Sequence, residues 1–204
     1  MNIFKQKLSQ YNIILASSSP RRKQLLSSIG IEFEIIPPNI DEKKMHLDIP
    51  AQNYCQSLSV AKAINVYQAT LKPQNIPQII ISADTIVVLE NKIINKPKDN
   101  NEAIFFLKIL SNKKHQVFTG VCVLNCNNGK LICNYRKTDV YFRKLFEQEI
   151  IDYVNTGNSL DKAGGYGIQD DYGCFFVKKI DGCYNNVVGI PLELLYEMIS
   201  ISIK

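Results

Sequence analysis

A short apolar run ends in three serines, a proline and two arginines, in the segment 15–22. Ser19 suits the N-cap of a helix and Pro20 suits its first turn. The first amide N–H groups of a helix lack partners and attract anions. Arg21 and Arg22 oppose the helix dipole there, at a cost of about 0.3–1 kcal/mol each, which a bound phosphate would offset. The segment predicts either a phosphate site or a solvated helix start.

Asp84 interrupts an apolar run that extends from Ile79 to Val88. A carboxylate in apolar surroundings needs a partner, a metal ion or a shifted pKa. Ligand sites in α/β sheets lie beyond the carboxyl ends of strands, which is where a strand over Gln78–Ala83 would place Asp84. A plain turn between two strands is the alternative.

Three further polar positions are candidates for a site. Lys62 lies between two alanines in a predicted helix, Lys96 precedes a proline, and Asp41-Glu42 follows a predicted strand. The lysines suit a polyanion, and the carboxylates suit Mg²⁺, which prefers oxygen ligands. Ordinary surface lysines and a solvated acidic pair are the alternatives.

The segment 161–169 has three glycines in four positions and ends in Gln169. Glycine allows positive φ and close approach of the backbone to a ligand. The amide of Gln169 has both a donor and an acceptor, as recognition of a nucleobase edge requires. A plain flexible loop is the alternative.

Periodicity and turn signals then predict the elements that position these residues. Strands are expected over 12–16, 32–36, 78–83, 85–89, 92–94, 116–126, 130–142 and 174–180, and helices over 20–29, 51–71, 102–110, 147–155 and from Pro191 onward. Strands that alternate with helices, followed by a long hairpin, indicate an α/β protein with a mixed sheet.

Composition favours an ordinary globular protein of 204 residues, with 46% hydrophobic and 21% charged residues. The net charge of +5 fits a small polyanionic substrate, and the scattered basic residues form no patch for nucleic acid. Six cysteines without a CxxC pair, together with only two histidines, argue against a structural zinc site. The cysteines are expected to be free thiols and the histidines to be surface residues. No signal-peptide core or membrane span is visible, so a cytoplasmic location is expected.

The chain resembles the Maf family in a set of ordered segments that span nearly its whole length. The matching segments are Leu-Ala-Ser-Ser-Ser-Pro-Arg-Arg at 15–22, Ile-Asp-Glu at 40–42, Ala-Lys-Ala at 61–63, Ala-Asp-Thr at 83–85, Lys-Pro at 96–97, Asp-Lys-Ala-Gly-Gly-Tyr-Gly-Ile-Gln at 161–169 and Asn-Val-Val-Gly-Ile-Pro-Leu at 186–192. Each segment is weak evidence alone, whereas the ordered set is specific.

The resemblance implies one domain over 1–204, with an elongated mixed sheet, flanking helices and two lobes around a central cleft, like the inosine triphosphate pyrophosphatases. It also implies hydrolysis of nucleoside triphosphates between the α- and β-phosphates, a house-cleaning role in the nucleotide pool, a divalent cation (Mg²⁺ or Mn²⁺) and a homodimer. The Gly-Tyr-Gly-Ile-Gln loop resembles the subfamily that acts on dTTP and UTP. No membrane or nucleic-acid partner is expected.

Carried over position by position, the resemblance makes Asp84 the proton acceptor. It places Arg21, Thr85 and Gln169 at positions linked to substrate choice, Ser17, Lys62 and Lys96 in contact with substrate, and Glu42 with Asp84 at the metal. Ser82 and Asp170 depart from the family, which often has glycine at both positions. These changes bear on substrate preference more than on the reaction.

A nucleotide-binding regulator of cell division is the alternative function, because it would need the same nucleotide site without turnover. Asp84 favours the enzyme, since only catalysis needs a proton acceptor.

Overall fold

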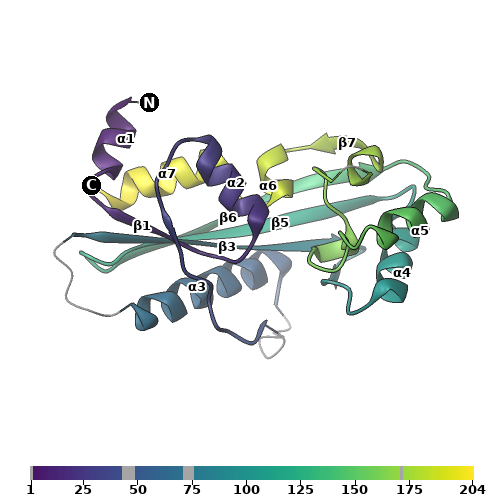
Figure 1. Cartoon of the computed structure of the whole chain (residues 1–204), viewed down its shortest axis with the longest axis horizontal. Helices are drawn as coiled ribbons and strands as arrows, with labels where there is room; N and C mark the ends of the chain where they lie inside the picture. Colours follow the sequence, from purple (N-terminus) through teal and green to yellow (C-terminus); the bar gives the residue numbers. More distant parts are fainter. Residues whose placement is uncertain (1, 43–48, 71–75, 171) are drawn as a thin grey trace. The chain divides into compact units, whose positions relative to one another are not determined.

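The computed structural model describes residues 2–42, 49–70, 76–170 and 172–204 (Figure 1). Its α-helices are α1 (Asn2–Leu8), α2 (Pro20–Ser28), α3 (Ala51–Ala69), α4 (Asn100–Leu110), α5 (Glu147–Asn155), α6 (Tyr184–Val188) and α7 (Leu192–Ser202). Its strands are β1 (Asn12–Ala16), β2 (Glu34–Ile35), β3 (Gln78–Leu89), β4 (Lys92–Ile94), β5 (Lys114–Asn125), β6 (Lys130–Phe142) and β7 (Val177–Asp181). Two 3₁₀ turns, Ala163–Gly165 and Gly173–Phe175, complete the described elements.

Within the described residues the strands form one seven-stranded mixed sheet. Its order is β2-β1-β3-β5-β6-β7, and β4 pairs with β3 outside this path. β1 runs parallel to β2 and to β3, with Ala16 opposite Ser82, whereas β4 and β7 run antiparallel to their neighbours. The prediction of an α/β fold with a mixed sheet and flanking helices is therefore confirmed.

Strand β3 corrects the prediction around Asp84. Two strands were expected, with Asp84 at the end of the first, but Gln78–Leu89 is one continuous strand that includes Asp84. The strand is buried along its length except at half-buried Thr85. It turns into β4 through Glu90 and Asn91, whose positive φ values of 49° and 64° suit a tight hairpin.

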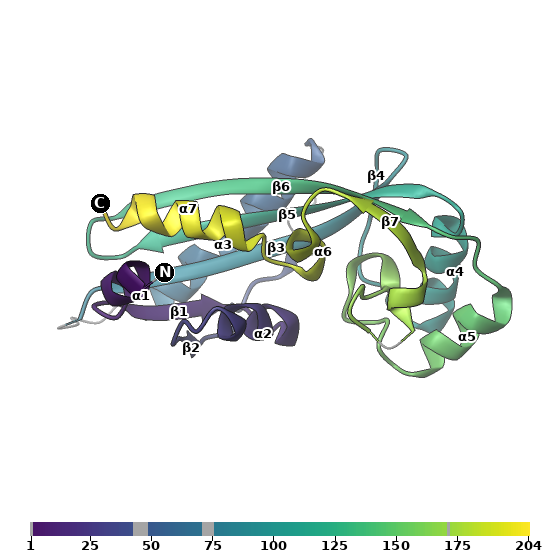
Figure 2. The same cartoon turned by 90° about the horizontal axis from the view of Figure 1, so that it is seen from above.

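The chain divides into two compact units, and the three long strands β3, β5 and β6 contribute to both. Unit 1 comprises residues 1–84, 119–136 and 189–204. In this unit α3 covers one face of the sheet and α7 the other (Figures 1 and 2). Asn125 donates a hydrogen bond of 2.8 Å to the carbonyl of Ser202, which ties the end of α7 to β5.

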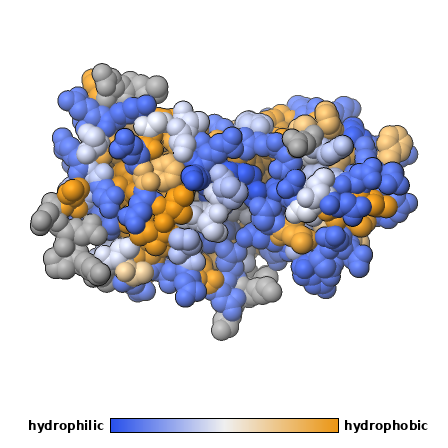
Figure 3. All heavy atoms as spheres, in the orientation of Figure 1, coloured by the Kyte–Doolittle hydropathy of each residue, from blue (hydrophilic) through white to orange (hydrophobic). Residues whose placement is uncertain are grey.

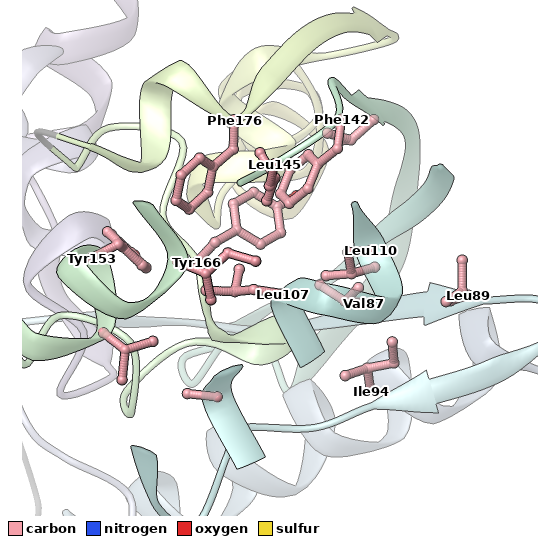
Figure 4. Close-up of a cluster of buried hydrophobic side chains, with 14 of the residues drawn as sticks. Val87, Leu89, Ile94, Leu107, Leu110, Phe142, Leu145, Tyr153, Tyr166 and Phe176 are labelled. Carbon is pink, nitrogen blue, oxygen red and sulfur yellow. The ribbon is translucent and has the colours of Figure 1, made fainter. Parts of the chain in front are cut away.

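Unit 2 comprises residues 85–118 and 137–188. Its core is a cluster of buried apolar side chains, several of them aromatic, between α4, α5 and the strands (Figure 4). Tyr153, Tyr166, Phe142 and Phe176 meet there edge to face, with ring centroids 4.7–5.9 Å apart. Such pairs add to the energy of burial and fix ring orientation, so this core is a rigid support for the glycine-rich loop that contains Tyr166.

Several element boundaries differ from the sequence-based expectation. Helices α1 and α6 were not predicted, because seven and five residues are too few for a periodic pattern. The last strand begins at Val177 rather than Cys174, because Gly173–Phe175 forms a 3₁₀ turn. Residue 71, the expected end of the helix that starts at Ala51, lies outside the described residues.

The face drawn in Figure 3 is mostly hydrophilic, with smaller hydrophobic patches. Among the described residues, no helix has the length and apolar character that crossing a membrane requires.

Candidate active site

Lys62 lies between two carboxylates in unit 1. Its ammonium nitrogen is 2.5 Å from Asp84 Oδ1 in β3 and 2.7 Å from Glu42 Oε1, just after β2. The side chains of Lys62 and Asp84 are only 6% and 8% exposed, whereas that of Glu42 is 39% exposed. A buried charge is tolerated when it is paired and hydrogen-bonded, so this cluster explains how Asp84 can interrupt an apolar strand.

Helix α3 places Lys62 on its buried face. The buried stripe runs through Tyr54, Leu58, Lys62 and Val66, at the four-residue spacing of one helix face. The stripe includes Lys62 because the two carboxylates neutralise its charge.

Two close approaches hold α3 against the sheet. The Ser82 hydroxyl in β3 donates a hydrogen bond of 2.5 Å to the carbonyl of Ser59, one turn before Lys62. At Gly120 in β5, an added Cβ would lie 2.5 Å from the carbonyl carbon of Cys55. Only glycine allows this approach. The contacts at Ser82 and Gly120 together set the distance between α3, which carries Lys62, and the sheet.

The turn between β1 and α2 forms the second part of the candidate site. Ser17 Oγ accepts hydrogen bonds from the Ser19 amide at 3.1 Å and from Arg22 Nη1 at 3.3 Å. Ser19 is the N-cap residue and Pro20 opens the helix, as predicted, although the Ser19 side chain makes no capping bond. Arg21 is half-buried in the first turn of α2.

Arg22 belongs to the segment that predicts a phosphate site, whereas the family resemblance assigns only Arg21 to substrate choice. It is 9% exposed, and its Nε donates to the carbonyl of Gly189, 167 residues away. Burial lowers the pKa of Arg22, and the charges of Asp84 and Glu42 oppose that shift. Arg22 is therefore electrostatically part of the Lys62 cluster. The sequence signal was its position beside Arg21, and its partner Gly189 could not be read locally.

Three predicted residues belong to unit 2. Thr85 follows Asp84 in β3, Lys96 is exposed just after β4, and Gln169 is exposed in the glycine-rich loop. The amide of Gly164 donates a hydrogen bond of 3.1 Å to the carbonyl of Asn95, which joins the loop to the segment that carries Lys96. Each unit thus groups its own predicted residues: Ser17, Arg21, Glu42, Lys62 and Asp84 in unit 1, and Thr85, Lys96 and Gln169 in unit 2.

The cysteines are free thiols in the structure, as predicted. Burial raises the pKa values of Cys55 and Cys122 to about 12, which keeps both thiols protonated. The expectation of surface histidines is wrong for His115, which is 1% exposed and lies 2.7 Å from the Tyr166 hydroxyl. Its partner is distant in sequence, so no local pattern revealed its burial. His46 lies outside the described residues.

The carboxylates of Glu42 and Asp84 fit a divalent cation. Both reach the same ammonium group, so their oxygens converge, and Mg²⁺ is commonly held by one or two carboxylates plus phosphate oxygens of a substrate. In the part of the chain that the structure describes, no three histidine, cysteine, aspartate or glutamate side chains form a group that could hold a metal ion. The two carboxylates of Glu42 and Asp84 match the donor set of a cation that is shared with a phosphate ligand.

Comparison with known proteins adds relatives of almost the same length. The dTTP/UTP pyrophosphatase of Caldicellulosiruptor saccharolyticus is 42% identical over 187 residues, which cover 92% of each chain. That of Ruminiclostridium cellulolyticum is 43% identical over 188 residues, covering 92% of this chain and 94% of the relative. A HAM1 protein from Coxiella burnetii aligns in three dimensions over 94% of this chain and 99% of its own, with 13% identity and a TM-score of 0.48.

The family described as Maf-like protein matches residues 12–201. This range includes both arginines after β1, the Lys62 cluster and the glycine-rich loop. With a family match over nearly the whole chain and relatives above 40% identity, the chain belongs to the Maf family.

Proposed function

We propose that the protein is a nucleoside triphosphate pyrophosphatase that converts dTTP and UTP to the monophosphate and diphosphate. The observation that carries the proposal is the buried contact of Lys62 with Asp84 and Glu42, beside Arg22. In this cluster the cations of Lys62 and Arg22 suit a polyphosphate. The carboxylates of Asp84 and Glu42 suit a metal ion, and a carboxylate can also accept a proton. The names of the relatives support the same reaction. We propose that the whole chain, 1–204, works as one domain on the cytoplasmic nucleotide pool.

In the proposed reaction, water attacks the α-phosphorus and the bond to the bridging oxygen of the β-phosphate breaks. The electron pair of that bond leaves with diphosphate, and Asp84 accepts the proton of the attacking water. A positioned base of this kind contributes about 10²–10⁴ in rate. Lys62, Arg21 and Lys96 neutralise the charge on the phosphate chain, and Ser17 with the first amides of α2 binds a phosphate oxygen.

Glu42 and Asp84 are the residues that would hold a divalent cation. When bound, such an ion polarises a phosphoryl oxygen and neutralises developing negative charge. Lys62, already between these carboxylates, would exchange part of its contact with them for contact with phosphate. The chain's own charges thus hold the two carboxylates in place before a substrate arrives.

Base choice is assigned to Gln169 and Thr85. The Gln169 side chain is exposed in a turn of the glycine-rich loop and has both a donor and an acceptor to offer the edge of a pyrimidine. Thr85 adjoins the proposed proton acceptor along β3 and offers a hydroxyl.

The experiment is diphosphate release from dTTP, UTP, CTP and 7-methyl-GTP with Mg²⁺ or Mn²⁺, for the wild type and Asp84→Asn. Asp152→Asn, which makes the same change at an exposed position in α5, is the control. Metal-dependent release that favours dTTP and UTP, falls at least about 10²-fold in Asp84→Asn and persists in Asp152→Asn supports the proposal.

Near-normal turnover by Asp84→Asn would show that Asp84 is not the proton acceptor. It would not contradict the proposed hydrolysis of nucleoside triphosphates. If folded wild-type protein binds these nucleotides but releases no diphosphate from any of them, the enzymatic proposal fails and the regulator of cell division takes its place.

A further inference from the structure

The hydroxyl of Tyr153 holds both ends of a short turn in unit 2. Tyr153 lies in α5 and is 1% exposed. Its hydroxyl donates a hydrogen bond of 2.7 Å to Asp170 Oδ2 and accepts one of 3.1 Å from the Gly167 amide. One buried hydroxyl group therefore joins the first and last residues of the segment 167–170.

The segment 167–170 is itself closed as a turn. The amide of Asp170 donates to the carbonyl of Gly167 at 3.2 Å, which is the pattern of a β-turn with Ile168 and Gln169 at its centre. The Asp170 carboxylate also lies directly against Gly167, where an added Cβ would be 2.5 Å from Oδ2. Gln169 is thus held at the third position of a turn that is fixed from both sides.

Lys162 compensates the negative charge of the Asp170 carboxylate. Its ammonium nitrogen lies 3.3 Å from Asp170 Oδ2 and 2.7 Å from Asp161 Oδ1, and it donates to the carbonyl of Asn158. The Lys162 side chain is 7% exposed and that of Asp170 16%. Because these groups are largely removed from water, their attraction is screened less than that of a surface pair.

The tyrosine is in the correct protonation state to act as a donor. Burial, and next the hydrogen bond to Asp170, raise the pKa of Tyr153 above its ordinary value. The phenol therefore keeps its proton at neutral pH, and Asp170 can accept it in a hydrogen bond.

We propose that Tyr153 and Asp170 are positioning residues that clamp the turn 167–170 and so determine which nucleobase Gln169 accepts. The inference rests on the proposed function and extends it to two residues with no direct part in the chemistry.

The test compares Tyr153→Phe, Asp170→Gly and Asp170→Asn with the wild type. The first two remove the hydrogen bond between residues 153 and 170, whereas asparagine keeps an acceptor for the tyrosine. The ratio of kcat/KM for UTP to that for CTP is expected to fall about tenfold in Tyr153→Phe and Asp170→Gly, the factor that corresponds to one hydrogen bond. Asp170→Asn is expected to keep most of the ratio, and kcat for the best substrate should change less than the ratio does.

Tyr166→Phe is the matched control. It removes another buried hydroxyl of the same cluster, but the partner of that hydroxyl is His115 in β5 rather than the turn. Tyr166→Phe is expected to lose about as much stability as Tyr153→Phe and to keep the UTP-to-CTP ratio of the wild type. Amide exchange provides a readout without turnover: the Gly167 and Asp170 amides should exchange about tenfold faster in Tyr153→Phe and remain protected in Tyr166→Phe.

The outcomes separate the clamp from the reaction. Unchanged exchange in Tyr153→Phe and Asp170→Gly, or faster exchange with an unchanged UTP-to-CTP ratio, overturns the clamp while the reaction stands. An inactive wild type overturns the reaction instead, and base choice is then measured as the ratio of dissociation constants for UTP and CTP in the same variants. An unchanged ratio of these constants would again overturn the clamp.

Discussion

The ammonium group of Lys62 in α3 lies 2.5 Å from a carboxylate oxygen of Asp84 in β3, and both side chains are buried. This pair makes the continuity of β3 possible, because it neutralises the charge that interrupts the apolar strand. It also places a cation beside the proposed proton acceptor.

Replacing Lys62 with methionine is expected to destabilise the protein by about 3–5 kcal/mol, because it leaves the buried Asp84 carboxylate without its closest partner. Turnover should fall as well. Urea unfolding at pH 7 in the absence of divalent metal measures the first effect. Lys108→Met, which breaks the exposed pair with Glu147, should change stability little. Equal effects of the two substitutions would contradict the burial argument.

Gly120→Ala is expected to cost about 1–3 kcal/mol of stability and to reduce turnover. The new methyl group would overlap the backbone of α3 at Cys55, and the helix must move, taking Lys62 with it. Thermal unfolding and diphosphate release measure both effects. The control is Gly129→Ala in the β5–β6 hairpin, where a Cβ meets nothing within 4 Å and only the positive φ of 70° is unfavourable. Gly129→Ala should lose stability but keep its turnover per folded molecule. Unchanged stability and turnover in Gly120→Ala would refute the prediction.

Gln169→Ala is expected to loosen base choice more than it slows the best substrate. The side chain is exposed, so its removal should leave stability nearly unchanged. Relative kcat/KM values for dTTP, UTP and CTP are the measurement, with Gln148→Ala on the exposed side of α5 as the control. Relative rates that stay the same in Gln169→Ala would show that another group selects the base.

Folding stability is expected to decrease as pH falls below about 6.5, partly through His115. Burial lowers the pKa of His115 to about 3, while the nearby Asp139 charge opposes the shift. Between these values the unfolded chain binds a proton that the folded chain does not, so the free energy of unfolding falls by up to about 1.4 kcal/mol per pH unit. The stability advantage of the wild type over His115→Gln should therefore shrink by about 2 kcal/mol between pH 7 and pH 5. Denaturant unfolding at both pH values checks this, and a constant difference would rule it out.

The sequence by itself determined the family, the α/β class and most of the elements. These features depend on local signals: strand β1 matches its apolar run, α5 ends before Gly157, and the Asn-Asn-Gly segment joins β5 to β6. Ordered motifs also indicated Asp84 and Gln169 as candidates. Such patterns are readable because each arises from neighbours in the chain.

Only the tertiary structure decided which polar side chains are buried and which groups are their partners. An ordinary surface lysine was the alternative for Lys62, His115 was expected at the surface, and no burial was predicted for Arg22. The partners that bury them, Asp84, Tyr166 and Gly189, are 22, 51 and 167 residues away. The Tyr153 clamp likewise depends on Asp170, 17 residues further along the chain. A charged or polar group is buried only where folding brings its partner within hydrogen-bond distance, and no local pattern contains that partner.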